Sequence, residues 1–162
     1  GKLYPAKWDL VKYADTFLSD ANYTNTNWYI LRYSDVLLLY AEALNELGKS
    51  PTDDAYEAIN IVRRRAGLSD LSGLSYEQFR QAVRDERSHE LCFEGHRKQD
   101  LIRWGIYYES IMQTRNDLNQ WHEQANNYYL VGQYTVKGKH ELLPIPQRDL
   151  DLMTSCTQNP NW

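Results

Sequence analysis

One short segment of the chain contains residue types that could bind a metal. His89-Glu90-Leu91-Cys92-Phe93 begins like a zinc-protease helix, in which two histidines one turn apart bind the ion and the glutamate acts as a base. The second ligand must lie four residues after His89, and that position is Phe93. His96 is two turns from His89, too far to share one ion without bridging ligands. We therefore predict no metal and no other cofactor.

Carboxylates are the second possible source of chemistry. Glycoside hydrolysis needs two of them roughly 5 to 10 Å apart across a sugar. The chain has 22 Asp and Glu residues, but no pattern selects such a pair. It also has no Gly-x-Ser-x-Gly elbow, phosphate-binding glycine loop or nucleophile motif. We therefore expect a protein that is not an enzyme.

Aromatic and amide side chains suggest a different chemistry, the binding of sugars. The chain has 13 Tyr and 5 Trp but only 3 Phe, so most rings carry a polar edge. A sugar is apolar on its faces and polar around its rim, and it needs flat rings beside amide groups. Two polar stretches outside the helical stripes combine these groups. The predicted ligand-binding residues are Tyr23, Asn25, Trp121, Asn127, Tyr128 and Tyr129. Packing against the core is the alternative role for each ring.

A helical hairpin over residues 28–67 is the main element predicted to position these groups. Between residues 29 and 47, apolar side chains recur at three- and four-residue spacing, which predicts a helix buried on much of its circumference. Gly48 is its expected stop, and the second helix runs to Gly67. The short connection predicts antiparallel helices. Aromatic residues on periodic apolar faces are assigned to the core: Tyr33, Tyr40, Tyr56 and Trp104.

A long helix is predicted over residues 75–104. It starts with a capping box formed by Ser75 and Gln78, and Gly95 is the position where it could bend. Three charges interrupt its apolar stripe: Glu86, Glu90 and Arg97. Because a lone buried charge is strongly unfavourable, we predict structural ion pairs for Arg97 and at least one of these glutamates, with each other or with a neighbouring helix.

The remaining sequence is loop-rich. Residues 105–120 support a weaker helix, and residues 121–140 are irregular with room for a short β-hairpin. Three prolines in the tail predict an extended C-terminal strap. We therefore expect a mainly α fold in a single domain, residues 1–162, that combines a tetratricopeptide-like helical hairpin with further helices, irregular loops and this strap. The net charge of −4, with no basic face, argues against nucleic acid as a partner.

Several motifs in order resemble one protein family. The segment AEALNELGKSPTDDAYEAINIVRRRAG is similar to a tetratricopeptide repeat. Together with RDERSHELCFEGHRKQDLIRWG, LLPIPQRDLDL and the closing TQNPNW, it resembles the C-terminal part of SusD/RagB-family proteins, over roughly residues 8–162. In place of Lys98-Gln99, members of that family often have an aromatic residue before the Asp.

The resemblance implies a function that is not catalytic. Family members are lipid-anchored outer-membrane proteins of Bacteroidetes that capture glycans or other nutrients and cover a SusC-type TonB-dependent transporter as a lid. It implies a receptor whose anchor, signal and other repeats lie outside this sequence, and it carries over no individual site residue. The alternative is a helical-repeat module that binds a protein partner and has no small-molecule ligand.

Overall fold

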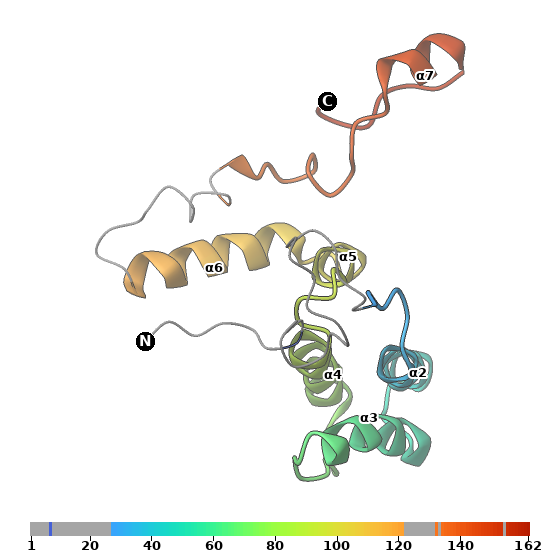
Figure 1. Ribbon diagram of the computed structural model, residues 1–162, viewed down its shortest axis with the longest axis vertical. Coiled ribbons are helices and arrows are strands. Elements are labelled where there is room, and N and C mark those ends of the chain that lie inside the picture. Colours follow the sequence, from blue (N-terminus) through green and yellow to red (C-terminus); the bar gives the residue numbers. More distant parts are fainter. Residues whose placement is uncertain (1–6, 8–26, 122–131, 133, 154) are drawn as a thin grey trace, which may run out of the picture. The chain divides into compact units, whose positions relative to one another are not determined.

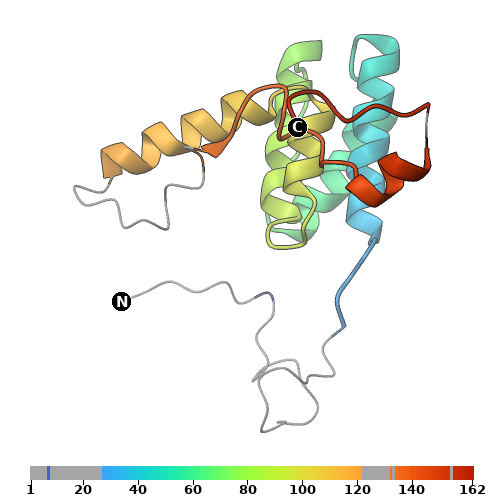
Figure 2. The same ribbon diagram turned by 90° about the horizontal axis from the view of Figure 1, so that it is seen from above.

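The computed structural model describes Lys7 and residues 27–121, 132, 134–153 and 155–162 (Figures 1 and 2). These residues form helices and turns without any β-strand, which confirms the predicted mainly α fold. The chain divides into two compact units, residues 1–97 and 98–162, whereas a single domain was expected. The predicted β-hairpin falls largely on residues outside the described part. Within the described ranges, no helix is both long and apolar enough to cross a membrane.

Unit 1 (residues 1–97) is built on three helices, α2 (Tyr33–Gly48), α3 (Asp53–Arg65) and α4 (Tyr76–Glu90) (Figure 1). The first two form the predicted hairpin. Thr52 caps α3 by accepting a hydrogen bond from the backbone N–H of Ala55 at 3.2 Å. The predicted capping box at the start of α4 is confirmed, because Ser75 and Gln78 each bond the other's backbone.

The core of unit 1 lies between these three helices. Tyr56 of α3 is half-buried and packs edge-on against Phe79 of α4, with ring centroids 4.9 Å apart. This confirms the predicted inward position of Tyr56. The fully buried apolar side chains come from all three helices: Leu38, Ala41, Ala55, Ala58, Ile59, Val62, Phe79 and Val83. Burial of this apolar surface holds the helices together.

The prediction that α2 is buried on much of its circumference is wrong. Tyr33 is 70% exposed and Tyr40 is 48% exposed, so neither belongs to the core. The buried face of α2 consists of Asp35, Leu38, Ala41 and Asn45. Periodicity identifies the apolar faces of a helix, but it does not say which face a neighbour covers.

The prediction of one helix over residues 75–104 is also wrong. Helix α4 ends at Glu90, and α5 (Arg97–Arg103) begins after a turn. Phe93 and Gly95 in this turn have φ angles of 64° and 86°. Left-handed backbone cannot continue a right-handed α-helix, so α4 ends before this turn and α5 is a separate helix.

Unit 2 (residues 98–162) contains most of α5, α6 (Tyr107–Trp121) and α7 (Gln147–Leu152). Trp104 was assigned to the core. It follows the last residue of α5 in the sequence, and its side chain is half-buried. The tail is not a continuous extended strap, because α7 begins directly after Pro146. Gln158 ties the two sides of α7 together: its amide accepts from the backbone N–H of Ile145 at 2.8 Å and donates to the Ile145 carbonyl at 2.9 Å.

Candidate functional site

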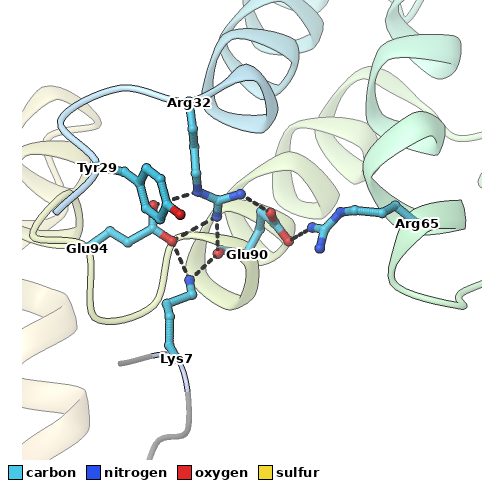
Figure 3. A pocket seen from close by; sticks show the side chains of 6 residues that line it. All are labelled: Lys7, Tyr29, Arg32, Arg65, Glu90 and Glu94. Carbon is cyan, nitrogen blue, oxygen red and sulfur yellow. Dashed lines mark hydrogen bonds and ion pairs between the residues drawn. The ribbon is translucent and has the colours of Figure 1, made fainter. Parts of the chain in front are cut away.

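A charged cavity in unit 1 is the first place where functional groups converge. It has a volume of about 310 Å³ and is lined by Lys7, Tyr29, Arg32, Arg65, Glu90 and Glu94 (Figure 3). The three basic and two acidic residues of this set are called the Arg32 cluster below. Arg32 directly precedes α2, Glu90 ends α4, and Glu94 lies in the turn that follows α4. The end of α4 therefore positions the Glu90 carboxylate, and the turn that follows positions the Glu94 carboxylate.

Arg32 holds the cluster together. Its guanidinium binds the Glu94 carboxylate in a two-point arrangement, from Nε at 2.6 Å and from Nη2 at 2.8 Å. Nη1 pairs with the Glu90 carboxylate, and Nη2 donates to the Glu90 backbone carbonyl at 2.5 Å. The Glu94 side chain is only 1% exposed, so this pairing neutralises a buried charge.

Two further cations complete the cluster from other parts of the chain. The Lys7 ammonium pairs with Glu94 and donates to the backbone carbonyls of Glu90 at 2.8 Å and Cys92 at 3.1 Å. Arg65, at the end of α3, pairs with Glu90. Cations on carbonyls at the C-terminal end of a helix are favourable, because these groups carry its partial negative charge.

The pKa values of the carboxylates in the cluster fit a structural role better than a role in proton transfer. Burial raises the pKa of Glu90 and of Glu94, but the hydrogen bonds and charge of Arg32 outweigh burial and leave both pKa values below the ordinary value. A glycosidase acid needs a carboxyl pKa raised towards neutrality. These two carboxylates have the opposite shift, so they hold no proton to donate near neutral pH.

Other ion pairs hold the three helices of unit 1 together. Asp35 and Arg87 form a buried pair between α2 and α4 at 2.7 Å, with side chains 5% and 3% exposed. Glu86 of α4 pairs with Arg63 of α3 at 2.9 Å. Sequence reasoning missed the Asp35 pair, although an aspartate inside an otherwise apolar helical run was a usable signal.

The residues predicted to form structural ion pairs thus lie in different surroundings. Glu86 lies against α3, and Glu90 is part of the Arg32 cluster. Arg97 is exposed and opens α5, so it is not on the same helical stripe as the two glutamates. Within the described residues, no group of three or more His, Cys, Asp or Glu side chains could hold a metal ion.

A second cavity, of about 250 Å³, lies within unit 2 and is rich in aromatic rings. It is called the Trp162 hollow and is lined by Lys98, Tyr107, Tyr134, Thr135, His140, Leu142, Leu143 and Trp162. Tyr134 is 73% exposed and Trp162 is 44% exposed. The hollow therefore presents aromatic surface to solvent, and sequence reasoning did not select any of its residues.

The Trp162 ring is held by hydrogen bonds on its polar edge. Nε1 lies 3.1 Å from the backbone carbonyls of both Lys139 and Leu142, to which it donates. His140 packs edge-on against the indole, with ring centroids 5.5 Å apart, and the Lys139 ammonium lies 4.3 Å from the ring centroid. The ring is thus oriented while much of it stays accessible.

The residues predicted to bind a ligand lie almost entirely outside the described part of the chain. Trp121 ends α6, whereas sequence reasoning placed it at the start of an irregular stretch, and its side chain is not described. The other predicted positions lie outside the described residues: Tyr23, Asn25, Asn127, Tyr128 and Tyr129.

Comparison with known proteins gives one consistent result. The model of the SusD family matches residues 4–162. The crystal structure of a SusD homolog from Bacteroides thetaiotaomicron VPI-5482 is 55% identical with a TM-score of 0.88, covering 98% of this chain and 31% of that chain. The starch-binding protein SusD of Bacteroides thetaiotaomicron is 29% identical over 156 residues, which is 96% of this chain and 25% of the relative.

A third match is to a laminarin-binding SusD-like protein. It is 30% identical with a TM-score of 0.57, over 83% of this chain and 23% of that protein. The chain therefore spans between 23% and 31% of the length of these three proteins.

Proposed function

The chain belongs to the SusD family, and we propose that it is part of a receptor that binds glycans or other nutrients without cleaving them. The observation that carries this proposal is the family match over residues 4–162, with relatives named for binding starch and laminarin. The mechanism is capture and handover: helices supply a rigid scaffold, and loops display the ligand contacts.

The ligand contacts that we propose are the aromatic and amide residues of two polar segments. Rings supply flat apolar surface for the faces of a sugar, and amides bind its hydroxyl groups. The residues are Tyr23, Asn25, Trp121, Asn127, Tyr128 and Tyr129.

Isothermal titration of the complete receptor tests this function. The panel contains neutral and acidic oligosaccharides, glycopeptides and peptides, and the length of each bound glycan is measured after incubation. We expect binding to at least one glycan, no cleavage, and a weaker affinity after Trp121→Ala or Tyr128→Ala. Absence of binding across the panel, or shortened products, contradicts the proposal.

We also propose that the receptor is lipid-anchored at the outer-membrane surface and works with a SusC-type TonB-dependent transporter. This rests on family membership alone. The cheapest check is the gene itself: a lipobox cysteine after a signal peptide and a neighbouring transporter gene are expected. Copurification of the receptor with that transporter is the direct test, and a receptor recovered alone from mild detergent contradicts the partnership.

One observation favours a packing role for one face of α2 in unit 1. Exposed apolar side chains of α2 recur at helical spacing on one face: Tyr33, Val36, Tyr40 and Leu47. Beside them, a groove of about 330 Å³ between α2 and α3 is lined partly by Leu37, Ile61 and Val62. Helical repeats need neighbours to cover such faces, and the relatives are three to four times longer than this chain. We infer that further helices of the receptor pack there.

Sedimentation velocity tests this role of α2. The chain by itself should self-associate as concentration rises, because the uncovered face is apolar. Tyr33→Ser with Tyr40→Ser should weaken association, while Val136→Ser, at an exposed apolar residue of unit 2, should not. A chain that stays monomeric at all concentrations and binds ligand as well as the complete receptor contradicts the inference.

A further inference from the structure

The Trp162 hollow has the surface chemistry of a sugar site in a part of the chain separate from the proposed loop contacts. Its rings come from two directions along the sequence, Tyr107 at the start of α6 and Tyr134 with Trp162 from the tail. Cavities for drug-sized ligands measure roughly 300–1,000 Å³, so a hollow of about 250 Å³ suits a single sugar ring better than a long oligosaccharide.

The hollow is preorganised to bind. The polar edge of Trp162 is already engaged by two backbone carbonyls, so a ligand meets the ring as an apolar surface. Two side-chain amides support the same segment: Asn161 donates to the Gly138 carbonyl at 3.0 Å, and Asn159 donates to the Leu143 carbonyl at 2.6 Å. Rings held in place before binding reduce the entropy lost when a ligand is bound.

The charge of the hollow selects among sugars. Lys98 supplies a cation at its lining, and no Asp or Glu side chain is among the described residues that line it. The backbone N–H of Val136 donates to Nδ1 of His140 at 2.8 Å, which leaves Nε2 as the protonated, donating nitrogen of the neutral ring. The polar side chains in the lining therefore carry N–H donors or hydroxyl groups, a set that complements an anion.

We propose that the Trp162 hollow binds one anionic sugar residue of a glycan, carrying a carboxylate or a sulfate. The apolar face of the sugar packs on the Trp162 and Tyr134 rings. Its acidic group pairs with Lys98, and His140 donates a hydrogen bond to the same group or to a neighbouring hydroxyl. This site is additional to the loop contacts of the proposed function and does not depend on them.

Isothermal titration of the complete receptor with four defined probes tests the site. The anionic probes are trigalacturonate and 6-sulfated galactotriose, and the uncharged partners are the methyl ester of the first and unsulfated galactotriose. We expect at least one anionic probe to bind more tightly than its partner. Trp162→Ala and Tyr134→Ala should each raise its Kd roughly threefold to tenfold, because each removes an aromatic contact. Lys98→Gln should raise the Kd of the anionic probe about twofold to fivefold, so that it no longer binds more tightly than its uncharged partner.

Matched variants in unit 1 serve as controls. Trp28→Ala and Lys49→Gln alter an exposed tryptophan and an exposed lysine outside the hollow, and they should leave all four affinities unchanged. Circular dichroism checks that each variant is folded, and Tyr134→Ala, at a more exposed ring, replaces Trp162→Ala if the latter unfolds.

Three results overturn the site. The first is equal affinity for both members of each probe pair. The second is an unchanged Kd in folded Trp162→Ala and Tyr134→Ala. The third is a tri-glutamate peptide that binds as tightly as the anionic probes. If these appear while the receptor still binds a neutral glycan that Trp121→Ala weakens, only the Trp162 hollow fails and the proposed function stands.

Discussion

The cavity that contains the Arg32 cluster and the Trp162 hollow are both lined by polar and aromatic side chains, yet their polar groups make different contacts. In the Arg32 cluster, cations and carboxylates bind one another, and Glu94 is 1% exposed. In the Trp162 hollow, backbone carbonyls engage the indole N–H while the ring stays 44% exposed. The difference teaches that charged side chains already bound to one another stabilise a fold, whereas a ring that is oriented but still accessible is available to a ligand.

The largest expected effect on stability comes from breaking the buried ion pair of unit 1. Asp35→Leu removes the buried carboxylate that pairs with Arg87 between α2 and α4, and it should lower the free energy of unfolding by roughly 3–5 kcal/mol. Urea denaturation measures this. Asp35→Leu with Arg87→Met should recover most of the loss, because well-packed apolar residues can replace a buried pair. A single variant as stable as the parent would show that the pair does not support unit 1.

The next effect concerns the Arg32 cluster itself. Arg32→Gln removes the two-point contact with Glu94 and the charge beside Glu90, and it should lower the free energy of unfolding by roughly 2–4 kcal/mol. Arg64→Gln is the matched control: its pair with Glu57 is exposed and screened by solvent, so a much smaller loss is expected. Loss of glycan binding in folded Arg32→Gln, with no change in stability, would reverse the roles assigned to the two cavities.

Acid should weaken unit 1 by a smaller and gradual amount. Hydrogen bonding to Arg80 lowers the pKa of Glu46 to about 2, and Arg32 keeps the pKa values of Glu90 and Glu94 below the ordinary 4.5. Carboxylates with depressed folded-state pKa values stabilise the protein above their unfolded pKa, and this contribution is lost as the pH falls through the folded value.

Urea denaturation between pH 7 and pH 2.5 checks this expectation. The free energy of unfolding should decline below about pH 4.5. Glu94→Gln should make that decline shallower, while Glu57→Gln, at an exposed glutamate, should not alter it. Stability that is constant or rises towards pH 2.5 would argue that the carboxylates do not stabilise unit 1.

The smallest expected effect on stability sharpens the contrast from the side of unit 2. Tyr134 is 73% exposed, so Tyr134→Ala should change the free energy of unfolding by less than about 0.5 kcal/mol. The same substitution should weaken binding of an anionic sugar. Thermal denaturation beside titration separates the two quantities, and a large stability loss without an affinity change would make Tyr134 a structural residue.

Local sequence signals predicted much of unit 1. The Ser75 and Gln78 capping box and the stop at Gly67 are local features, since a cap depends on a few neighbouring residues. The end of α4 was missed, because Gly95 was read only as a bend and Phe93 gives no sequence signal for its positive φ. Tyr33 and Tyr40 were misplaced because their apolar character does not reveal whether a partner covers them.

The sequence by itself determined the helical class, the hairpin and the family resemblance, since propensity, capping and periodicity act over short distances. Only the tertiary structure decided which charges meet and which rings stay accessible. Arg32 lies 58 residues from Glu90, and the Trp162 indole donates to carbonyls more than 19 residues away. Such contacts depend on how distant segments pack, and no local pattern in the chain records that.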